Sequence, residues 1–428
     1  MIIKSLQLKN YRCFSDFMID FDDKLTVLIG INGAGKTAVL DALSVFLKWA
    51  GYSRKENNDL CDINATDIAI GKNLNDVTLC LSVKSRDDEY EEDDDDLYMY
   101  LYFAKSYSCN IHRGGDKELI NYLKLKELLE NTNPVIVAYM ASRIVSNEDL
   151  VFNKNGNHIT NDLIIDRSFS RMIDYASTVS WFHDTDADEA RTIRDKGEKV
   201  EFPELKAVRD ALSKALLDRY ERPRMSGSPP ELIIYEKGTD VSFKINQLSD
   251  GYKAMLALVM DLARRMAQAQ SDSNSHESIL HTSAIVLIDE IELHLHPSWQ
   301  QTVLNTLMDI FPNTQFIVTT HSPQVLSSIP SKHIRVLSDG KAYSVKEQTQ
   351  GAEASRILKD VFGVDLRPNG LDIVQVLNSY TDLVYDEKWD TPEAKELRIK
   401  LDEHFGNDEP KLIELDLHID NIKWERGL

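Results

Sequence analysis

The sequence predicts an α/β fold organised around a parallel β-sheet. Three observations point to it. A strand-like run, Leu25 to Ile29, leads directly into Gly30 to Thr37, which fits the pattern G-x-x-x-x-G-K-[ST] at every fixed position. A helix with an apolar face is expected next, from Thr37 to Lys48. One helical segment separates the apolar runs 284–288 and 315–319. This alternation is typical of neighbouring strands in a parallel sheet that is buried on both faces.

The octapeptide between the first strand and helix predicts a site for a nucleoside triphosphate, expected to be ATP. Its glycines let the backbone curl until N–H groups surround the phosphates, and Lys36 brings positive charge to the β and γ oxygens. The Thr37 hydroxyl is suited to ligate Mg²⁺, and the helix points its positive end at the same anion. A glycine-rich turn without a ligand is the alternative. The predicted ATP-binding residues are Gly30, Asn32, Gly33, Ala34, Gly35, Lys36 and Thr37.

The segments that follow alternate between strands, a charged block and helices. Nine of the ten residues from Asp87 to Asp96 are acidic, and they separate two alternating strands, 77–83 and 97–103. Such a block is normally a solvated loop, here at the tip of a hairpin. A helix is expected around 116–131, helical segments over 166–220, and a connector over 222–230, which is rich in Pro, Ser and Gly.

A second helix start is predicted after strands at 232–235 and 241–245. Ser249 lies where a helix N-cap is expected, so that its hydroxyl and the amides of Asp250 and Gly251 would form an anion-seeking helix terminus. An ordinary capped helix is the alternative.

Acidic residues end the apolar strand 284–288. In phosphate-loop ATPases a carboxylate at this place holds Mg²⁺ and a neighbouring one polarises the attacking water, so we assign Asp289 to the metal and Glu290 to the general base. His321 follows the strand 315–319, at the edge where ligands bind in open α/β sheets. It is predicted to contact the γ-phosphate or to orient the water, and a structural histidine is the alternative. His294 and His296 have metal-like spacing without a third ligand, and a structural or dimer-contact role is expected.

The tail beyond residue 345 is predicted to be helical and to serve docking or assembly, because the nucleotide motifs are complete by His321. It carries apolar residues beyond those that the head requires: Phe362, Leu377, Tyr380, Leu383, Trp389, Leu401, Phe405 and Trp424. A cap folded back on the head is the alternative. The expected divisions are an N-lobe with the phosphate loop and the acidic hairpin at 1–165, a helical insert at 166–230, the second ATPase half at 231–346 and the C-terminal helical domain at 347–428.

Composition narrows the class of protein. The 428 residues carry a formal charge of −21, which argues against non-specific adhesion to nucleic acid. Four scattered cysteines suggest neither a zinc site nor a disulfide framework. No apolar run is long enough for a membrane span and no signal peptide is evident, so a cytoplasmic protein without a membrane partner is expected.

The ordered motifs resemble those of an ABC-type ATPase head. They are Gly30–Thr37, Leu248–Gly251, Leu287–Glu290 and Thr319–Ser322. The opening Leu8 to Phe14 resembles the RecF, Rad50 and OLD branch of that family. There, the signature serine and glycine reach the γ-phosphate bound in the opposite subunit. The resemblance implies a homodimer or a higher even oligomer, in which Ser249 and Gly251 complete the partner's site, with Asp250 where the commonest signature has glycine.

Two softer stretches, 181–202 and 351–368, resemble the ATPase subunit of Septu and retron-associated anti-phage systems. That resemblance implies a separate HNH nuclease subunit whose activity follows the Mg·ATP state, and it names a retron reverse transcriptase with its nucleic acid as further candidate partners. OLD relatives carry a Toprim nuclease. None is expected here, because no strand ending in Glu-Gly follows His321, and Asp416 and Asp420 are spaced i,i+4 on a predicted helix.

Two other functions stay open from the sequence. One is a RecF- or Rad50-like DNA-repair ATPase that acts directly on DNA, which the negative charge and the short insert disfavour. The other is the ATPase subunit of a transporter, which would not explain the insert or the C-terminal helices.

Overall fold

The computed structural model describes residues 1–52, 67–72, 77–84, 97–103, 109–110, 134–141, 175–197, 199–216, 219–226, 231–270, 276–406 and 408–427. They form two compact units, Met1–Ile357 and Leu358–Leu428. The acidic block at 87–96, the helix predicted at 116–131 and the boundary predicted at 165 lie outside the described residues.

A six-stranded sheet forms the centre of the first unit. Its order is β14-β13-β3-β12-β11-β7, and every neighbouring pair except β13 and β14 is parallel. The strands are β3 (Leu25–Ile29), β7 (Val135–Tyr139), β11 (Ala284–Ile288), β12 (Thr314–Thr319), β13 (Ile334–Ser338) and β14 (Lys341–Ser344). All residues of β3, β11 and β12 are buried, which explains the continuous apolar sequence of β11 and the largely apolar sequence of β3. The predicted α/β class is confirmed.

The pair of β13 and β14 was not predicted, although the sequence carries a signal for it. Ser338 pairs with Lys341, so Asp339 and Gly340 alone form the turn, with φ angles of 49° and 70°. An Asp-Gly pair with positive φ at both positions is the preferred two-residue hairpin turn.

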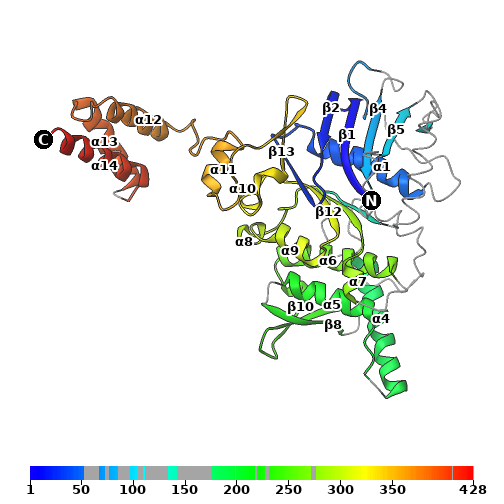
Figure 1. Ribbon diagram of the computed structural model, residues 1–428. Coiled ribbons are helices and arrows are strands. Elements are labelled where there is room, and N and C mark those ends of the chain that lie inside the picture. Colours follow the sequence, from blue (N-terminus) through cyan, green and yellow to red (C-terminus); the bar gives the residue numbers. More distant parts are fainter. Residues whose placement is uncertain are drawn as a thin grey trace. The chain divides into compact units, whose positions relative to one another are not determined.

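An antiparallel sheet lies at one end of the unit (Figure 1). Its order is β2-β1-β4-β5-β6. The strands are β1 (Ile2–Tyr11), β2 (Phe14–Asp20), β4 (Thr78–Lys84), β5 (Leu97–Phe103) and β6 (Cys109–Asn110). β4 and β5 pair antiparallel from Thr78–Tyr102 to Val83–Leu97, as expected for strands that flank the acidic block.

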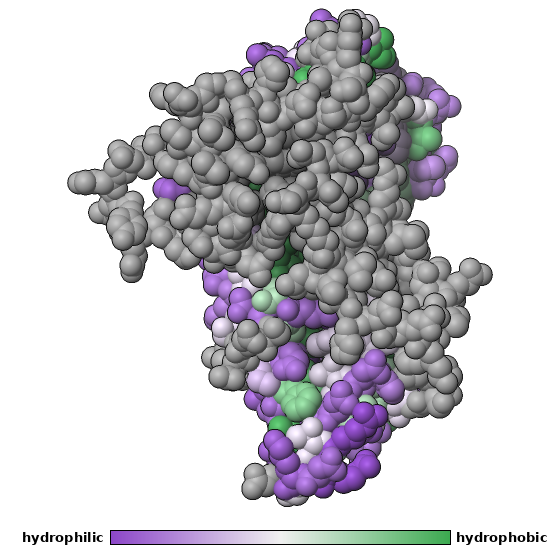
Figure 2. Space-filling view, turned by 90° about the vertical axis from the view of Figure 1, so that its right-hand side faces the viewer, coloured by the Kyte–Doolittle hydropathy of each residue, from purple (hydrophilic) through white to green (hydrophobic). Residues whose placement is uncertain are grey.

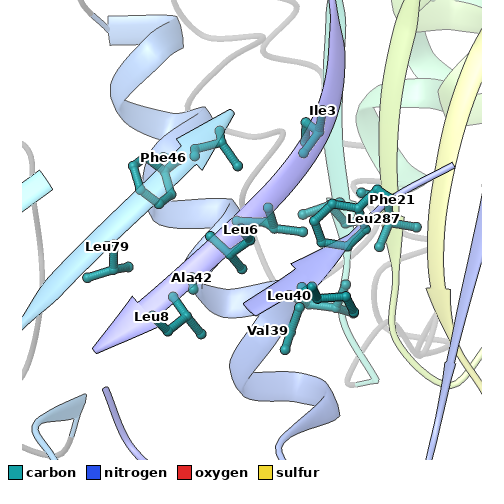
Figure 3. Packing of buried hydrophobic residues seen from close by; sticks show 14 of the residues in the cluster. Ile3, Leu6, Leu8, Phe21, Val39, Leu40, Ala42, Phe46, Leu79 and Leu287 are labelled. Atoms are coloured by element: carbon teal, nitrogen blue, oxygen red, sulfur yellow. The ribbon is translucent and has the colours of Figure 1, made fainter. Parts of the chain in front are cut away.

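The helix after the phosphate loop, α1 (Lys36–Tyr52), packs between the two sheets. Figure 3 shows Leu6 and Leu8 of β1 facing Ala42 and Leu40 of α1, with Leu287 of β11 beyond the helix. Gln315 of β12 also joins the sheets directly. Its side chain accepts a hydrogen bond from Ile3 N and donates one to Ile3 O, both at 2.8 Å. Helix α1 therefore lies between two sheets that are also joined to each other.

A third sheet, β10-β9-β8, lies at the opposite end of the unit with the helices of the middle segment (Figure 1). Its strands are β8 (Tyr220–Ser226), β9 (Glu231–Glu236) and β10 (Ser242–Lys244). The helices are α4 (Tyr175–Lys196), α5 (Pro203–Ala215), α6 (Asp250–Ala269) and α7 (His276–Leu280). The surface at the lower end of Figure 2, where α4 lies in Figure 1, is largely hydrophilic.

The prediction of a connector at 222–230 is wrong for residues 222–226, which belong to β8. Pro223 suggested a loop because proline cannot donate a ladder hydrogen bond. The strand tolerates it because β8 is an edge strand, and its register shifts between Glu221 and Arg224.

Short elements complete the first unit, and a helical bundle forms the second. The short elements are η3 (Ile245–Gln247), α8 (Pro297–Gln300), α9 (Val303–Ile310), α10 (Pro323–Leu326) and η4 (Ser331–His333). Helix α11 (Ala354–Asp360) begins in the first unit and ends in the second. The bundle consists of α12 (Asp372–Tyr385), α13 (Pro392–Phe405) and α14 (Pro410–Glu425). Among the helices that the structure describes, none is both long and apolar enough to cross a membrane.

Candidate active site

Three loops with predicted site residues begin at neighbouring strand ends. β12 lies between β3 and β11 and is parallel to both, so their carboxyl ends share one edge of the sheet. The phosphate loop follows β3, Asp289 and Glu290 follow β11, and Thr320 and His321 follow β12. The candidate site therefore lies where ligands bind in open α/β sheets.

The phosphate loop needs its glycines for steric reasons. Gly30 has φ of +154°, and a Cβ there would lie 2.5 Å from Leu337 O. Gly35 has φ of +97°, and its Cβ would lie 2.3 Å from Phe14 Cζ. Both positions are closed to side chains, because the loop packs against β13 and the start of β2. Asn32 and Gly33 are exposed, and Ala34 is half-buried.

Lys36 is held inside this loop. Its Nζ donates to Gly30 O at 2.9 Å and to Ile31 O at 3.1 Å, and the residue is 7% exposed. Burial lowers the pKa of Lys36, while the negative charges of Asp289, Glu290 and Glu292 act to raise it. A desolvated ammonium that donates to neutral carbonyls is suited to bind phosphate oxygens.

Asp289 is the centre of the polar contacts. Its Oδ2 accepts a hydrogen bond from Thr37 Oγ1 at 3.1 Å, and its Oδ1 accepts one from Thr319 Oγ1 at 2.6 Å. Asp289 is buried, and its backbone N–H donates to Tyr139 O at 2.8 Å. Thr319 was not predicted as a site residue. A threonine that directly follows the apolar run Phe316–Val318 of a buried strand was the signal that could have found it.

The donor set fits a phosphate-bound Mg²⁺. Thr37 and Asp289 offer a hydroxyl and a carboxylate oxygen, which are hard ligands that Mg²⁺ prefers. No group of three or more His, Cys, Asp or Glu that could hold a metal occurs among the described residues. Mg²⁺ does not require such a group, because phosphate oxygens and water usually supply its remaining ligands.

The two predicted catalytic residues, Glu290 and His321, lie on adjacent loops. Glu290 is half-buried and has φ of 49°, and its N–H donates to Thr319 Oγ1 at 2.8 Å. His321 is exposed, and its backbone N–H donates to Glu292 Oε1 at 2.6 Å. Glu292 was not predicted as a site residue.

The signature residues begin α6. Ser249 is the N-cap residue, at the position predicted, and its hydroxyl makes no cap hydrogen bond, which is not what the alternative of an ordinary capped helix requires. The hydroxyl therefore does not satisfy the amides of the first turn of α6. Asp250 is exposed, and its carboxylate pairs with Lys253 at 3.1 Å. Gly251 is required because a Cβ there would lie 2.8 Å from His294 O.

The two histidines of the turn that faces Gly251 differ in what they contribute, one through its backbone and one through its side chain. His294 adopts φ of 67° in the turn that Gly251 approaches. His296 is the N-cap residue of α8, and its Nδ1 accepts from Ser298 N at 3.3 Å. A structural role for His296, one of the two roles expected, agrees with this geometry.

The signature and the phosphate loop are not joined within one chain. α6 packs against α4, α5, α7 and β7. In the part of the chain that the structure describes, no hydrogen bond links residues 249–251 to residues 30–37.

A buried ionic cluster connects α6 to the strand beside β11. Asp261 accepts hydrogen bonds from Tyr139 Oη at 2.9 Å, Thr178 Oγ1 at 3.1 Å, Arg264 NH2 at 2.8 Å and Arg265 Nε at 2.7 Å. Burial opposes ionisation of Asp261, but the two guanidinium groups outweigh it and lower its pKa to about 2. Because Tyr139 O also accepts a hydrogen bond from Asp289 N–H, this cluster supports the strand edge that carries the predicted metal ligand.

Family models match both halves of the first unit. Residues 1–165 match the model described as "AAA ATPase domain", and residues 142–327 match the one described as "AAA domain, putative AbiEii toxin, Type IV TA system". Together with the strand order and the ordered motifs, these matches support the class of a phosphate-loop ATPase, with each model covering less than half of the chain.

Curated relatives match nearly the whole chain. The Retron Ec83 probable ATPase of Escherichia coli is 29% identical, with 99% of this chain and 87% of the relative covered. The Retron Vc95 probable ATPase of Vibrio cholerae serotype O1 biovar El Tor is 25% identical, with coverages of 92% and 86%. The Septu protein PtuA of Bacillus thuringiensis is 22% identical, with 85% of each chain covered. The resemblance to retron and Septu ATPases is thereby confirmed.

Among solved structures, an SMC head bound to the C-winged helix domain of ScpA has a TM-score of 0.47 and 15% identity, over 81% of this chain and 98% of that one.

Proposed function

We propose that the chain is a dimerising ATPase whose Mg·ATP state controls a separate HNH-type nuclease in anti-phage defence. The observation that carries the enzymatic part is the convergence of Lys36, Thr37, Asp289 and Glu290 at one edge of the parallel sheet. The defence role rests on the similarity to retron and Septu ATPases.

Within this proposal each side chain has one task in hydrolysis. Lys36 exchanges the carbonyls of its own loop for β and γ oxygens, and Thr37 and Asp289 hold Mg²⁺. The metal, when bound, neutralises charge on the phosphates. Glu290 accepts a proton from the attacking water, so that ADP and inorganic phosphate are released. His321 contacts the γ-phosphate or orients that water.

The second part of the proposal is that two chains share each ATP. Ser249, Asp250 and Gly251 stand at the N-terminus of a long helix, where backbone N–H groups and the helix dipole favour an anion. Their lack of hydrogen bonds to the phosphate loop of the same chain, among the residues described, supports a role toward the partner's γ-phosphate. The assembly would be a homodimer or a higher even oligomer.

The third part concerns the C-terminal helices, proposed as the docking module. The prediction that their apolar residues form a surplus surface is wrong for most of them. Leu377, Tyr380 and Leu401 belong to the core of the bundle, and Leu383, Trp389 and Phe405 pack against it.

An exposed apolar stripe of the bundle lies instead on α14. Ile413, Leu417 and Trp424 are 45%, 60% and 83% exposed, while Leu412, Leu415 and Ile419 are buried on the opposite side of the helix. Helical spacing places the three exposed residues on one face. We assign this α14 stripe to the nuclease subunit, with a retron reverse transcriptase and its nucleic acid as further candidate partners.

Intrinsic nuclease activity is not part of the proposal. Asp416, the candidate carboxylate of the tail, lies within α14, and its Oδ2 accepts from Arg398 NH2 at 2.8 Å. That ion pair joins two helices of the bundle, which gives Asp416 a structural use.

Co-purification with an HNH subunit encoded beside this gene tests the proposal. We expect capture of the subunit, nucleotide-dependent cleavage by the complex and none by the chain alone. Leu417→Ser with Trp424→Ser should release the subunit, whereas Ile399→Ser, which alters an exposed isoleucine on α13, should not. Cleavage by the ATPase alone would refute the division of labour, and DNA-stimulated ATP turnover without any partner would favour the alternative of a DNA-repair ATPase.

A further inference from the structure

Side-chain bridges hold the segment after β12 to the segment after β11, and two of them flank His321. Glu292 forms the first, and it lies two residues beyond the proposed base. Gln300 forms the second, since its Oε1 accepts from Ser322 Oγ at 2.6 Å. His321 stands between the two attachment points, so its backbone is held on both sides.

The bridge of Glu292 uses both carboxylate oxygens. Oε2 accepts from Thr320 Oγ1 at 2.7 Å, and Oε1 accepts from His321 N at 2.6 Å. The Thr320 hydroxyl in turn accepts from Ser322 N at 3.0 Å. Short hydrogen bonds to an ionised acceptor are among the strong ones in proteins, so this bridge restrains the loop more than a neutral contact would.

Glu292 is itself fixed by a tight turn. Leu293 N donates to Glu290 O at 2.9 Å, and Leu295 N donates to Glu292 O at 2.9 Å. Ile291 N donates to Thr319 O at 3.0 Å, which ties the start of the same turn to β12. The Glu292 carboxylate therefore fixes the backbone of His321 relative to the loop that follows β11.

We propose that Glu292 is a positioning residue for ATP hydrolysis, which acts by fixing the backbone of His321 relative to Glu290. The inference rests on the proposed hydrolysis and on the role of His321 in it. The imidazole of His321 is exposed, and its direction depends on the backbone that carries it. A small displacement of a catalytic group can cost on the order of 10²-fold in rate, so a residue that prevents it affects turnover without touching ATP.

A role of Glu292 as a second base or metal ligand is a different hypothesis. It would require the Glu292 carboxylate to give up the hydrogen bonds that it accepts from Thr320 Oγ1 and from His321 N in this structure. The positioning role uses the contacts as they stand, and it predicts that an amide can replace the acid. Glutamine can accept from His321 N and donate to Thr320 Oγ1, whereas a base or a metal ligand needs the negative charge.

The test compares the full-length wild type with Glu292→Ala, Glu292→Gln, His321→Ala and the double variant Glu292→Ala/His321→Ala. Gln301→Ala is the matched control, because Gln301 Nε2 also bridges the two segments, to Gln324 Oε1 at 2.6 Å, on the exposed side. Steady-state kcat, nucleotide Kd and thermal unfolding are measured for each, with kcat taken below every unfolding transition.

We expect Glu292→Ala to lower kcat about 10- to 100-fold with little change in Kd, and Glu292→Gln and Gln301→Ala to retain most of the turnover. In the His321→Ala background, Glu292→Ala should have almost no further effect, because coupled residues are not additive. A full additional loss there, a Glu292→Gln variant as inactive as Glu292→Ala, or unchanged kcat in Glu292→Ala would each overturn the inference. A wild-type chain without ATP turnover would instead refute the proposed function.

Discussion

Thr319 donates a hydrogen bond to Asp289 across the carboxyl ends of β12 and β11, with 2.6 Å between Thr319 Oγ1 and Asp289 Oδ1. The same buried hydroxyl accepts from Glu290 N at 2.8 Å. One side chain thus orients the proposed metal ligand and the backbone of the proposed base. Glu290 needs this support, because its positive φ is uncommon for a residue with a side chain.

Replacing Thr319 by valine should therefore impair catalysis while leaving a well-packed strand. We expect a loss of about 10- to 100-fold in kcat and a higher Mg²⁺ requirement, since the hydroxyl orients a metal ligand from outside the metal's own coordination. ATP turnover measured over a Mg²⁺ titration checks this. The control is Thr314→Val at the other end of β12, where the buried Oγ1 has no hydrogen-bond partner among the described residues and its removal should leave turnover unchanged.

The Asp261 cluster predicts a large effect on stability. Asp261→Ala leaves the buried Arg264 and Arg265 without their shared carboxylate, and removing one member of a buried ion pair typically costs about 3–5 kcal/mol. Tyr139→Phe removes one donor out of the four and should cost less. Urea unfolding of the three proteins measures both differences, and equal stability of all three would contradict the assigned role.

The same cluster predicts how stability depends on pH. The pKa of Asp261 is about 2 in the folded chain against an ordinary value of 3.8, so the unfolded state binds the proton more readily. Its contribution is therefore present above pH 4 and is lost as the pH falls toward 2. In Asp261→Asn, the decline of the unfolding free energy between pH 4 and pH 2 should be shallower than in the wild type. A decline as steep as that of the wild type would show that other groups cause it.

Gly251 offers a test of the signature that leaves the phosphate loop unaltered. In Gly251→Ala the added Cβ meets His294 O at 2.8 Å, so the start of α6 or the facing turn must shift. We expect ATP to bind normally and turnover to fall, because the partner's γ-phosphate loses its contacts. Gly370→Ala, whose Cβ would meet no atom within 4 Å, is the control. Loss of ATP binding in Gly251→Ala would instead place α6 in the site of its own chain.

Shared catalysis can be tested by complementation. Lys36→Ala removes the phosphate-loop charge and Ser249→Arg blocks the signature, so each homodimer has only defective sites. A mixed dimer has up to one intact composite site, and mixing the two inactive variants should restore part of the turnover. No recovery, once subunit exchange has been verified with tagged chains, would contradict the shared site.

The sequence was sufficient where chemistry imposes fixed local spacing. Lys36 and Thr37 could be located because a phosphate loop needs particular residues at particular separations, and Asp289 because a fully buried strand ends immediately before it. The α/β class followed from the same strands, since burial on both faces makes the whole run apolar.

Residues that act across the fold could not be found in this way. Glu292 meets Thr320, and Thr319 meets Asp289, only because β11 and β12 are neighbours in the sheet. The exposure of Trp424 depends on which face of α14 the bundle covers, and the amphipathic spacing of the tail does not reveal it. Pro223 is accommodated by an edge position and an irregular register, both of which are tertiary features.

The measurement that tests the central claim most directly is ATP binding and turnover of the wild type beside Glu290→Gln and Lys36→Ala. The account predicts that the wild type hydrolyses ATP with Mg²⁺, that Glu290→Gln binds ATP but loses about 10²- to 10⁴-fold in turnover, and that Lys36→Ala does not bind. Wild-type turnover in Glu290→Gln would contradict the assignment of the base, and undiminished ATP binding by Lys36→Ala would contradict the site itself.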